Sequence, residues 1–405
     1  MRLERDSLTW LTYLQLGSYG YFLYGFGPTL SLLRDEQGVS RSVAGLHGTA
    51  LAVGSLLSAL VVARLVLRFG RTAVVWAGLA TLCAGVLTYA STTALPATLV
   101  GAFVGAFGGS FVVVSSAPVL SDHHGDSGPS AISEANAVAA GVGTVAPLVV
   151  GLSVGLGLGW RPAMLLLVPA VLALAVAGRN IRAPRPPAPV ATGERSPRLP
   201  RRFWISWGVV TAGIAVEFCL VLWTADVLRE RAGLGPGPAA AGVTALVAGM
   251  CVGRLGGGRL ALRWRVDTLL YAAILTAGAG FTVFWLTTSA LLALPALLVC
   301  GLGVALFYPL GIARAIDASE GRPDHASARA GIGAALASGA GPFALGALAD
   351  LAGLWLALLV VPALLALAAL GVWTSSRGSR PGPPDHSPFA LSPPSTSSRS
   401  ATLRT

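Results

Sequence analysis

Charged residues are scarce in this sequence, and lysine is absent from it altogether. Only 11% of the 405 residues are charged, whereas 54% are hydrophobic. A soluble domain carries roughly 25% charged residues, so this chain has too few charges to cover a surface of its size that faces water. The composition therefore predicts an integral membrane protein, most of whose surface is covered by lipid.

The signatures of several other function classes are missing as well. The sequence has no Walker motif, so we do not expect ATP to drive a reaction cycle. Its apolar segments contain no clustered nucleophile, paired acids or metal ligands, so we expect no enzyme activity, no cofactor and no bound metal. Four cysteines lie inside apolar runs without a zinc-like or CxxC spacing, and we interpret them as packing residues: Cys83, Cys219, Cys251 and Cys300.

The net charge of +11 does not indicate a nucleic-acid partner. All 28 basic residues are arginines, and most of them lie in short loops between apolar runs rather than on one basic face. One polar loop contains His123 and His124 beside Asp122 and Asp126. Metal binding is one interpretation of this loop, and a solvated loop is the one we prefer.

Twelve apolar runs are long enough to cross a bilayer, which takes about 20 residues. Because cytoplasmic loops are enriched in arginine, the loops also predict the orientation. Those on the side of the termini hold 23 arginines, Arg254 among them, and those on the other side hold five. The sequence therefore predicts a multi-pass protein of the inner (plasma) membrane with both termini in the cytoplasm. The runs are 9–33, 43–63, 73–92, 95–120, 131–156, 162–178, 203–228, 238–257, 268–288, 291–313, 327–348 and 354–373.

The second half of the chain repeats the first with an offset of 195 residues. Arg64 and Arg68 fall on Arg259 and Arg263, and Trp160 falls on Trp355. Parallel repeats of six helices imply a pseudo-two-fold axis along the membrane normal, with a substrate site between the halves. We predict a bundle at 1–178, a cytoplasmic linker at 179–202, a second bundle at 203–373 and a disordered tail at 374–405.

With these features the chain resembles the major facilitator superfamily. The loop after the second run ends in Arg68, Gly70 and Arg71, as the family's loop motif does, although Leu67 stands where the family has an aspartate. The resemblance implies an all-α membrane fold of twelve helices in two pseudo-symmetric bundles, which works by alternating access. The fifth and eleventh runs keep part of a motif common in the family's exporters, and we take its residues as gating candidates: Pro147, Gly151, Pro342 and Gly346.

Glu217 is the sharpest candidate for a functional side chain. It lies near the middle of the seventh run, where a carboxylate is costly and therefore suggests a function. Burial raises the pKa of a carboxyl group, so the position suits a proton-coupling residue. The alternative is a structural acid paired with a polar neighbour.

Polar side chains elsewhere in the runs are candidates to line a substrate cavity. The first run places tyrosines on one helical face, and we expect this face to point inward rather than to form an aromatic belt at the membrane surface. Hydroxyl groups near the ends of the fourth and tenth runs either bind a substrate or form hydrogen bonds with backbone groups that a proline kink leaves unpaired. The cavity candidates are Tyr13, Gln15, Tyr21, Tyr24, Ser115, Ser116, Trp223 and Tyr308.

Glu134 and Arg329 fall on each other in the repeat, near the cytoplasmic ends of their helices. They are candidates for a gate across the two halves, with surface charges as the alternative interpretation.

These observations predict a monomeric secondary transporter whose partners are a small-molecule substrate, protons and the lipid bilayer. Our first hypothesis is proton-coupled export of a small, partly apolar compound. The alternative is proton-coupled uptake of a small organic anion or metabolite, since the fourth run lacks the arginine that is common in the family's proton-coupled exporters. A more remote alternative is a membrane sensor that transports nothing.

Overall fold

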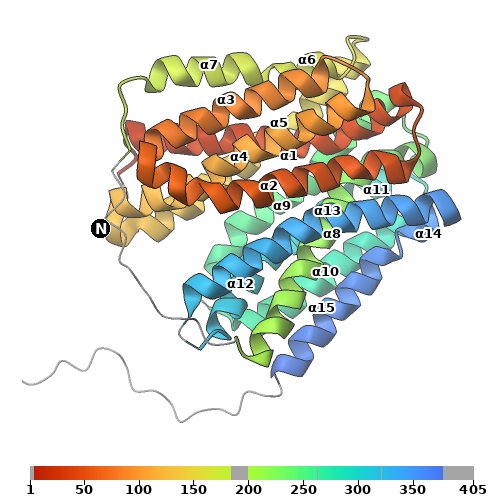
Figure 1. Ribbon diagram of the computed structural model, residues 1–405. Helices are drawn as coiled ribbons and strands as arrows, with labels where there is room; N and C mark the ends of the chain where they lie inside the picture. Colours follow the sequence, from red (N-terminus) through yellow and green to blue (C-terminus); the bar gives the residue numbers. More distant parts are fainter. Residues whose placement is uncertain (1–3, 184–198, 262, 321, 377–405) are drawn as a thin grey trace, which may run out of the picture.

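The computed structural model describes residues 4–183, 199–261, 263–320 and 322–376, and this part of the chain is helical throughout (Figure 1). The N-terminal half (N half) and the C-terminal half (C half) each contribute one bundle. The helices of the N half are α1 (Ser7–Gln37), α2 (Arg41–Phe69), α3 (Arg71–Ala90), α4 (Leu95–His124), the short η1 (Gly125–Ser127), α5 (Gly128–Gly155), α6 (Arg161–Leu165) and α7 (Leu167–Gly178). Those of the C half are α8 (Arg201–Ala232), α9 (Pro236–Ala261), α10 (Val266–Leu286), α11 (Ala290–Val304), α12 (Phe307–Asp317), α13 (Pro323–Ala352), α14 (Leu354–Ala357) and α15 (Val360–Ser376).

The 195-residue offset of the repeat recurs in the places where the helices begin. Helices α2, α3, α4 and α5 begin 195 residues before α9, α10, α11 and α13, respectively. Three of the twelve predicted runs are interrupted, between α6 and α7, between α11 and α12, and between α14 and α15. These interruptions explain why the helical elements outnumber the runs. The shared offset of the helix starts agrees with the repeat, and the predicted two pseudo-symmetric bundles are confirmed.

Eleven helical segments of the described chain are long and apolar enough to span a membrane. Helix α1 is the twelfth helix of the bundles and is 31 residues long, but its polar side chains leave it without an apolar stretch like those of the eleven. Polar side chains are costly in contact with lipid, so such a helix is stable where protein surrounds it. Twenty of its residues are buried, which agrees with a place inside the bundle.

The two bundles lie side by side, with the N half above the C half in Figure 1. They meet chiefly through α2 with α13, α5 with α9 and α1 with α8, and α1 also contacts α9. The end of the bundles where α1 and α8 begin is called the terminal end here, and the end where they finish is called the distal end. Helices α7 and α15 lie on the outer sides of their halves.

The ends of the predicted linker and tail differ slightly from the prediction. Helix α8 begins at Arg201 and so includes the last residues assigned to the linker, while α15 continues to Ser376, past the predicted start of the tail. Residues 181–183 return to the N half, where the Ala183 amide donates to the Thr72 hydroxyl at 2.9 Å. The remainder of both segments, 184–198 and 377–405, lies outside the described residues.

Helices α1 and α8 approach each other closely at Gly27. A Cβ atom on Gly27 would lie 2.1 Å from the carbonyl oxygen of Val221, and an adjacent backbone cannot yield as a flexible side chain can. This close approach requires glycine and holds α1 tightly against α8.

Replacing Gly27 with alanine should therefore push α1 away from α8 and destabilise this arrangement of the halves. Overpacking costs about 1–3 kcal/mol, which outweighs the gain of about 1 kcal/mol in helix propensity. The melting temperature of the purified protein in detergent measures the effect, and we expect Gly27→Ala to lower it. Gly141→Ala is the matched control, since Gly141 is also helical but has open space where a Cβ would lie. Equal melting temperatures for the two variants would contradict the tight crossing.

Candidate functional site: a buried cluster and a gate between the halves

Glu217 lies in a buried polar cluster that joins the two halves. Its Oε1 accepts a hydrogen bond from the Tyr24 hydroxyl of α1 at 3.2 Å and pairs with Nη2 of Arg254 in α9 at 3.3 Å. Arg254 also donates from Nη1 to the Tyr24 hydroxyl oxygen at 3.1 Å. Each of the three side chains therefore contacts the other two, and Glu217 itself is only 7% exposed.

Arg254 is the member of this cluster that the sequence does not single out. Its assignment to the loop arginines on the side of the termini is wrong, because it lies inside α9, seven residues before the helix ends. Its guanidinium turns inward to the buried carboxylate, although 26% of the side chain stays exposed. The sequence feature that indicates a place inside a helix is the position of Arg254 within the predicted run 238–257.

The cluster lies on the terminal side of the α1–α8 crossing. Tyr24 comes three residues before Gly27 in α1, and Glu217 comes four residues before Val221 in α8. Tyr308 of α12, which with Trp223 is a cavity candidate of the C half, is 43% exposed. Chemically, the cluster is a carboxylate held by one cation and one hydroxyl, and protonation of Glu217 would remove the charge that Arg254 binds.

A second polar contact joins α1 and α8 on the distal side of the crossing. The Ser31 hydroxyl donates to Oδ1 of Asp226 at 2.9 Å, and Asp226 is 2% exposed. These two residues are 195 positions apart, so each is the repeat mate of the other, and their contact lies at the pseudo-two-fold axis. Arg34 pairs with Asp226 at 2.9 Å, and its mate Arg229 donates to Ser31 at 3.2 Å, so the two arginines make equivalent contacts across the axis.

Further ion pairs surround this contact at the distal end. Arg229 pairs with Asp35 at 2.6 Å, and Arg41 pairs with Glu230. The Asp350 carboxylate of α13 accepts the backbone amides of Arg41 and Ser42, at 2.9 and 2.8 Å, and so caps the first turn of α2 across the halves. We call Ser31, Arg34, Asp226, Arg229 and Asp350 the distal gate.

The exporter-like motif residues lie in the seams beside the distal gate. A Cβ on Gly151 would lie 2.6 Å from the Gly237 carbonyl oxygen in α9, and one on Gly346 would lie 2.6 Å from the Arg41 carbonyl oxygen. The indole of Trp223 donates to the carbonyl oxygen of Pro342 at 3.1 Å. Trp223 is thus a buried packing residue of this seam. Pro147 lies in α5, one turn from Gly151.

Most of the other cavity candidates lie within the N half. The Tyr13 hydroxyl donates to Glu134 at 3.3 Å, and the Tyr21 hydroxyl donates to the Ala163 carbonyl oxygen at 2.7 Å. Gln15 and Ser116 line a small cavity between α1, α3, α4 and residues 181–183, and Ser115 is buried in α4. Of the tyrosines expected to line a cavity, it is Tyr24 that reaches the other half.

The loop-motif residues also make their contacts within the N half. Arg71 is buried and pairs with Asp122 at 2.6 Å, while exposed Arg68 lies over the ring of Phe69. Gly70 links α2 to α3 with a φ of 82°, a conformation that favours glycine.

The candidate gate between Glu134 and Arg329 is not closed in this structure. Glu134 pairs instead with Arg5 at 2.7 Å. Arg329 is exposed, and its carbonyl oxygen accepts the Trp207 indole at 2.8 Å. These contacts at the terminal end stay within one half, whereas those of the distal gate cross between halves. The structure is therefore closed at the distal end.

Replacing Asp226 with asparagine should loosen the distal gate, because it leaves Arg34 beside a neutral side chain. Breaking a buried ion pair costs about 3–5 kcal/mol. Spin labels at the exposed distal positions Ser91 and Ser289, in a protein without its native cysteines, should report longer distances in Asp226→Asn. Glu36→Gln is the control, since Glu36 pairs with Arg161 inside the N half. Unchanged distances in Asp226→Asn would contradict this role.

Comparison with known proteins agrees with this geometry. The family model described as "Major Facilitator Superfamily" matches residues 12–322, whereas comparison with curated protein sequences gives no match. The fold is similar to that of a bacterial homolog of the human lysosomal transporter Spinster in an inward-facing, occupied conformation, with a TM-score of 0.76, 15% identity and coverage of 93% of this chain and 98% of that one. It is also similar to the nucleoside transporter NupG (TM-score 0.69, 12% identity, 91% and 98% coverage) and to FucP in its outward conformation (0.60, 18%, 90% and 98%). With a family match over more than half of its length, the chain belongs to the major facilitator superfamily.

Proposed function

We propose that this chain is a proton-coupled transporter that exports a small, partly apolar compound, with Glu217 as the proton-coupling residue. The family points to a secondary transporter working by alternating access rather than to an enzyme. The observation that carries the finer proposal is the contact of Glu217 with Arg254 and, across the halves, with Tyr24. Proton binding there acts directly on a contact that holds the halves together.

The proposed coupling begins with protonation of Glu217. A neutral carboxyl group no longer attracts the guanidinium of Arg254, since the strength of their pairing depends on both charges. The hydrogen bond from Tyr24 weakens for the same reason, so α1 is held less firmly against α8 and α9. Protonation therefore shifts the population between arrangements of the halves, which is what coupling requires.

Two features support the export direction. Pro147 and Gly151 keep part of the motif that resembles the family's exporters, and Gly151 lies where α5 meets α9. With both termini in the cytoplasm of a bacterial plasma membrane, as the arginine distribution predicts, the closed distal end faces outward. The protein would then receive its substrate from the cytoplasm, as a monomer.

Arg254 favours a second candidate, uptake of a small organic anion with protons. Once Glu217 is protonated, the partly exposed guanidinium of Arg254 has lost its carboxylate partner. A substrate carboxylate could take that place through the same bidentate geometry. The two candidates predict opposite directions of proton movement relative to the substrate.

Transport by reconstituted protein tests the proposal. In proteoliposomes with an imposed pH gradient, a panel of small amphipathic cations and organic acids is offered, and proton flux is followed with a pH-sensitive dye. We expect Glu217→Gln to lose accumulation driven by the gradient, since glutamine cannot exchange a proton, while exchange without a gradient continues. Full gradient-driven accumulation in Glu217→Gln would refute the coupling role.

Glu320→Gln is the control for this experiment. Glu320 is a 69%-exposed acid of the loop after α12, so its loss removes a carboxylate without touching the cluster. We expect transport by this variant to equal that of the unmodified protein. Protons moving with the substrate, rather than against it, would decide for the uptake candidate.

A further inference from the structure

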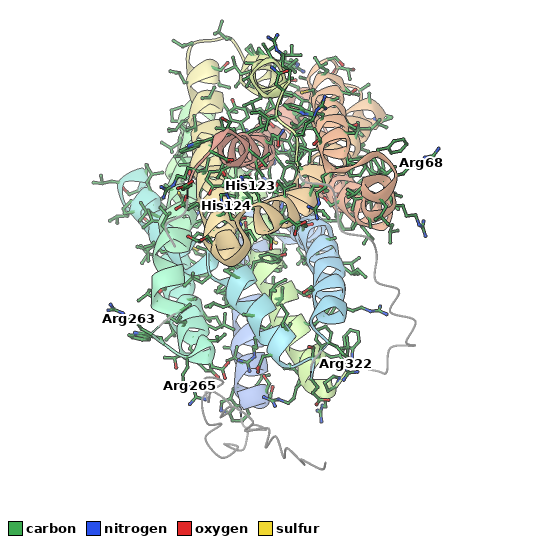
Figure 2. All side chains as sticks on the ribbon, turned by 90° about the vertical axis from the view of Figure 1, so that its left-hand side faces the viewer. Arg68, His123, His124, Arg263, Arg265 and Arg322 are labelled. Carbon is green, nitrogen blue, oxygen red and sulfur yellow. The ribbon has the colours of Figure 1, made fainter. Side chains whose placement is uncertain are left out.

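A compact group of imidazole and carboxylate side chains lies at the terminal end of the N half. Asp6 precedes the first turn of α1, and His123 and His124 are the last two residues of α4. Figure 2 looks onto this end of the molecule and shows both histidines there. One ligand atom from each of the three residues lies within 4.8 Å of the others.

The Asp6 carboxylate divides its two oxygens between α1 and α4. Its Oδ1 accepts the backbone amide and the hydroxyl of Thr9, at 2.9 and 2.6 Å, and thereby caps α1. Its Oδ2 faces Nε2 of His123 at 2.7 Å. Burial raises the pKa of Asp6, but the hydrogen bonds from Thr9 and His123 outweigh it and hold the pKa at about 2. The carboxylate is therefore ionised at neutral pH.

These hydrogen bonds also determine which imidazole nitrogens carry protons. An ionised carboxylate can only accept, so His123 donates from Nε2. The Thr9 hydroxyl gives its one proton to Asp6, so His124, whose Nε2 lies 2.8 Å from that hydroxyl, must donate to it. Two N–H groups thus converge on one carboxylate, one directly and one through Thr9.

We propose that Asp6, His123 and His124 bind one divalent transition-metal ion of the zinc class through their three converging ligand atoms. Imidazole nitrogen together with a carboxylate suits zinc-like ions, whereas calcium and magnesium prefer oxygen ligands. Ligand bonds of about 2.0–2.2 Å require the three ligand atoms to move closer together, and the partly exposed side chains are free to do so. Each neutral imidazole then carries its proton on Nδ1, and water completes the tetrahedron.

The bound ion would link the start of α1 to the end of α4. Both belong to the N half, so the ion reinforces that half without bridging to the other. The site is distinct from the cluster of Tyr24, Glu217 and Arg254, and it holds whether or not the proposed function does.

Zinc titration of the full chain tests this site. The protein is purified in detergent without a polyhistidine tag, and zinc chloride binding is followed by isothermal titration calorimetry. We expect one site per chain in the unmodified protein and a dissociation constant at least tenfold higher in His123→Ala/His124→Ala. Asp6→Asn should also weaken binding at least tenfold while keeping the fold, since asparagine caps a helix as well as aspartate does.

Two control variants separate ligands from their hydrogen-bonded surroundings. Thr9→Val removes the hydroxyl between Asp6 and His124 but no proposed ligand, and Ser121→Ala changes an exposed residue of the same helix end. Both should keep the dissociation constant within a few-fold of its original value. His325 and His386 are present in every variant, so binding to them does not affect the comparison.

Several results would overturn the site. One is a zinc affinity of Asp6→Asn equal to that of the unmodified protein. Another is displacement of zinc by calcium at concentrations equal to those of zinc. The third is a visible absorption spectrum of the cobalt-substituted protein that lacks the bands of a tetrahedral site. A monodisperse elution profile establishes that each variant is folded, and Asp6→Asn decides the question if the double histidine variant fails this requirement.

Discussion

The closed end of the molecule depends on one buried carboxylate at the pseudo-two-fold axis. Ser31 and Asp226 are repeat mates, so a contact between them must lie at the axis, where a duplicated unit meets itself. Two aspartates there would repel each other, and two serines would leave Arg34 and Arg229 to share Asp35 as their acidic partner. One serine and one aspartate give both arginines a partner. This position therefore requires that the halves differ in chemistry although they agree in fold.

The Glu217 cluster depends on the same pair of helices. Along α1, Tyr24 and Ser31 are seven residues or about 10 Å apart, and Gly27 lies between them in tight contact with α8. A rotation of the halves about this crossing that separates one contact brings the other together. Because Tyr24 binds Glu217 and Ser31 binds Asp226, each contact resists a different direction of rotation. In the proposed coupling, such an arrangement would let the charge on Glu217 influence a gate that it does not touch.

The sequence predicted the helices and the repeat well, but predicted side-chain partners poorly. Apolar runs and the 195-residue offset follow from the need to span lipid, which acts on every helix in the same way. Glu217 could be found because a mid-span acid is costly. Arg254 and Asp226 could not be assigned, because hydropathy does not report which neighbour compensates a charge. The face of Tyr13, Tyr21 and Tyr24 has helical spacing, yet its members reach α5, α6 and α8, since spacing alone does not say which helix packs there.

The two seams beside the gate show how such a structure can close firmly and still open. On one side the Asp350 carboxylate caps the start of α2. On the other side the missing Cβ of Gly237, at the start of α9, allows this helix to approach the backbone of Gly151 and of Gly155, the repeat mate of Asp350. Water can replace the carboxylate at the exposed amides, and ion pairs as exposed as Arg41 with Glu230 contribute only about 0–1 kcal/mol. The cost of opening is then concentrated at Asp226, whose burial makes its pairing matter most. A transporter needs states of similar free energy, and placing one strong contact among weak ones keeps that difference small enough for a proton or a substrate to reverse it.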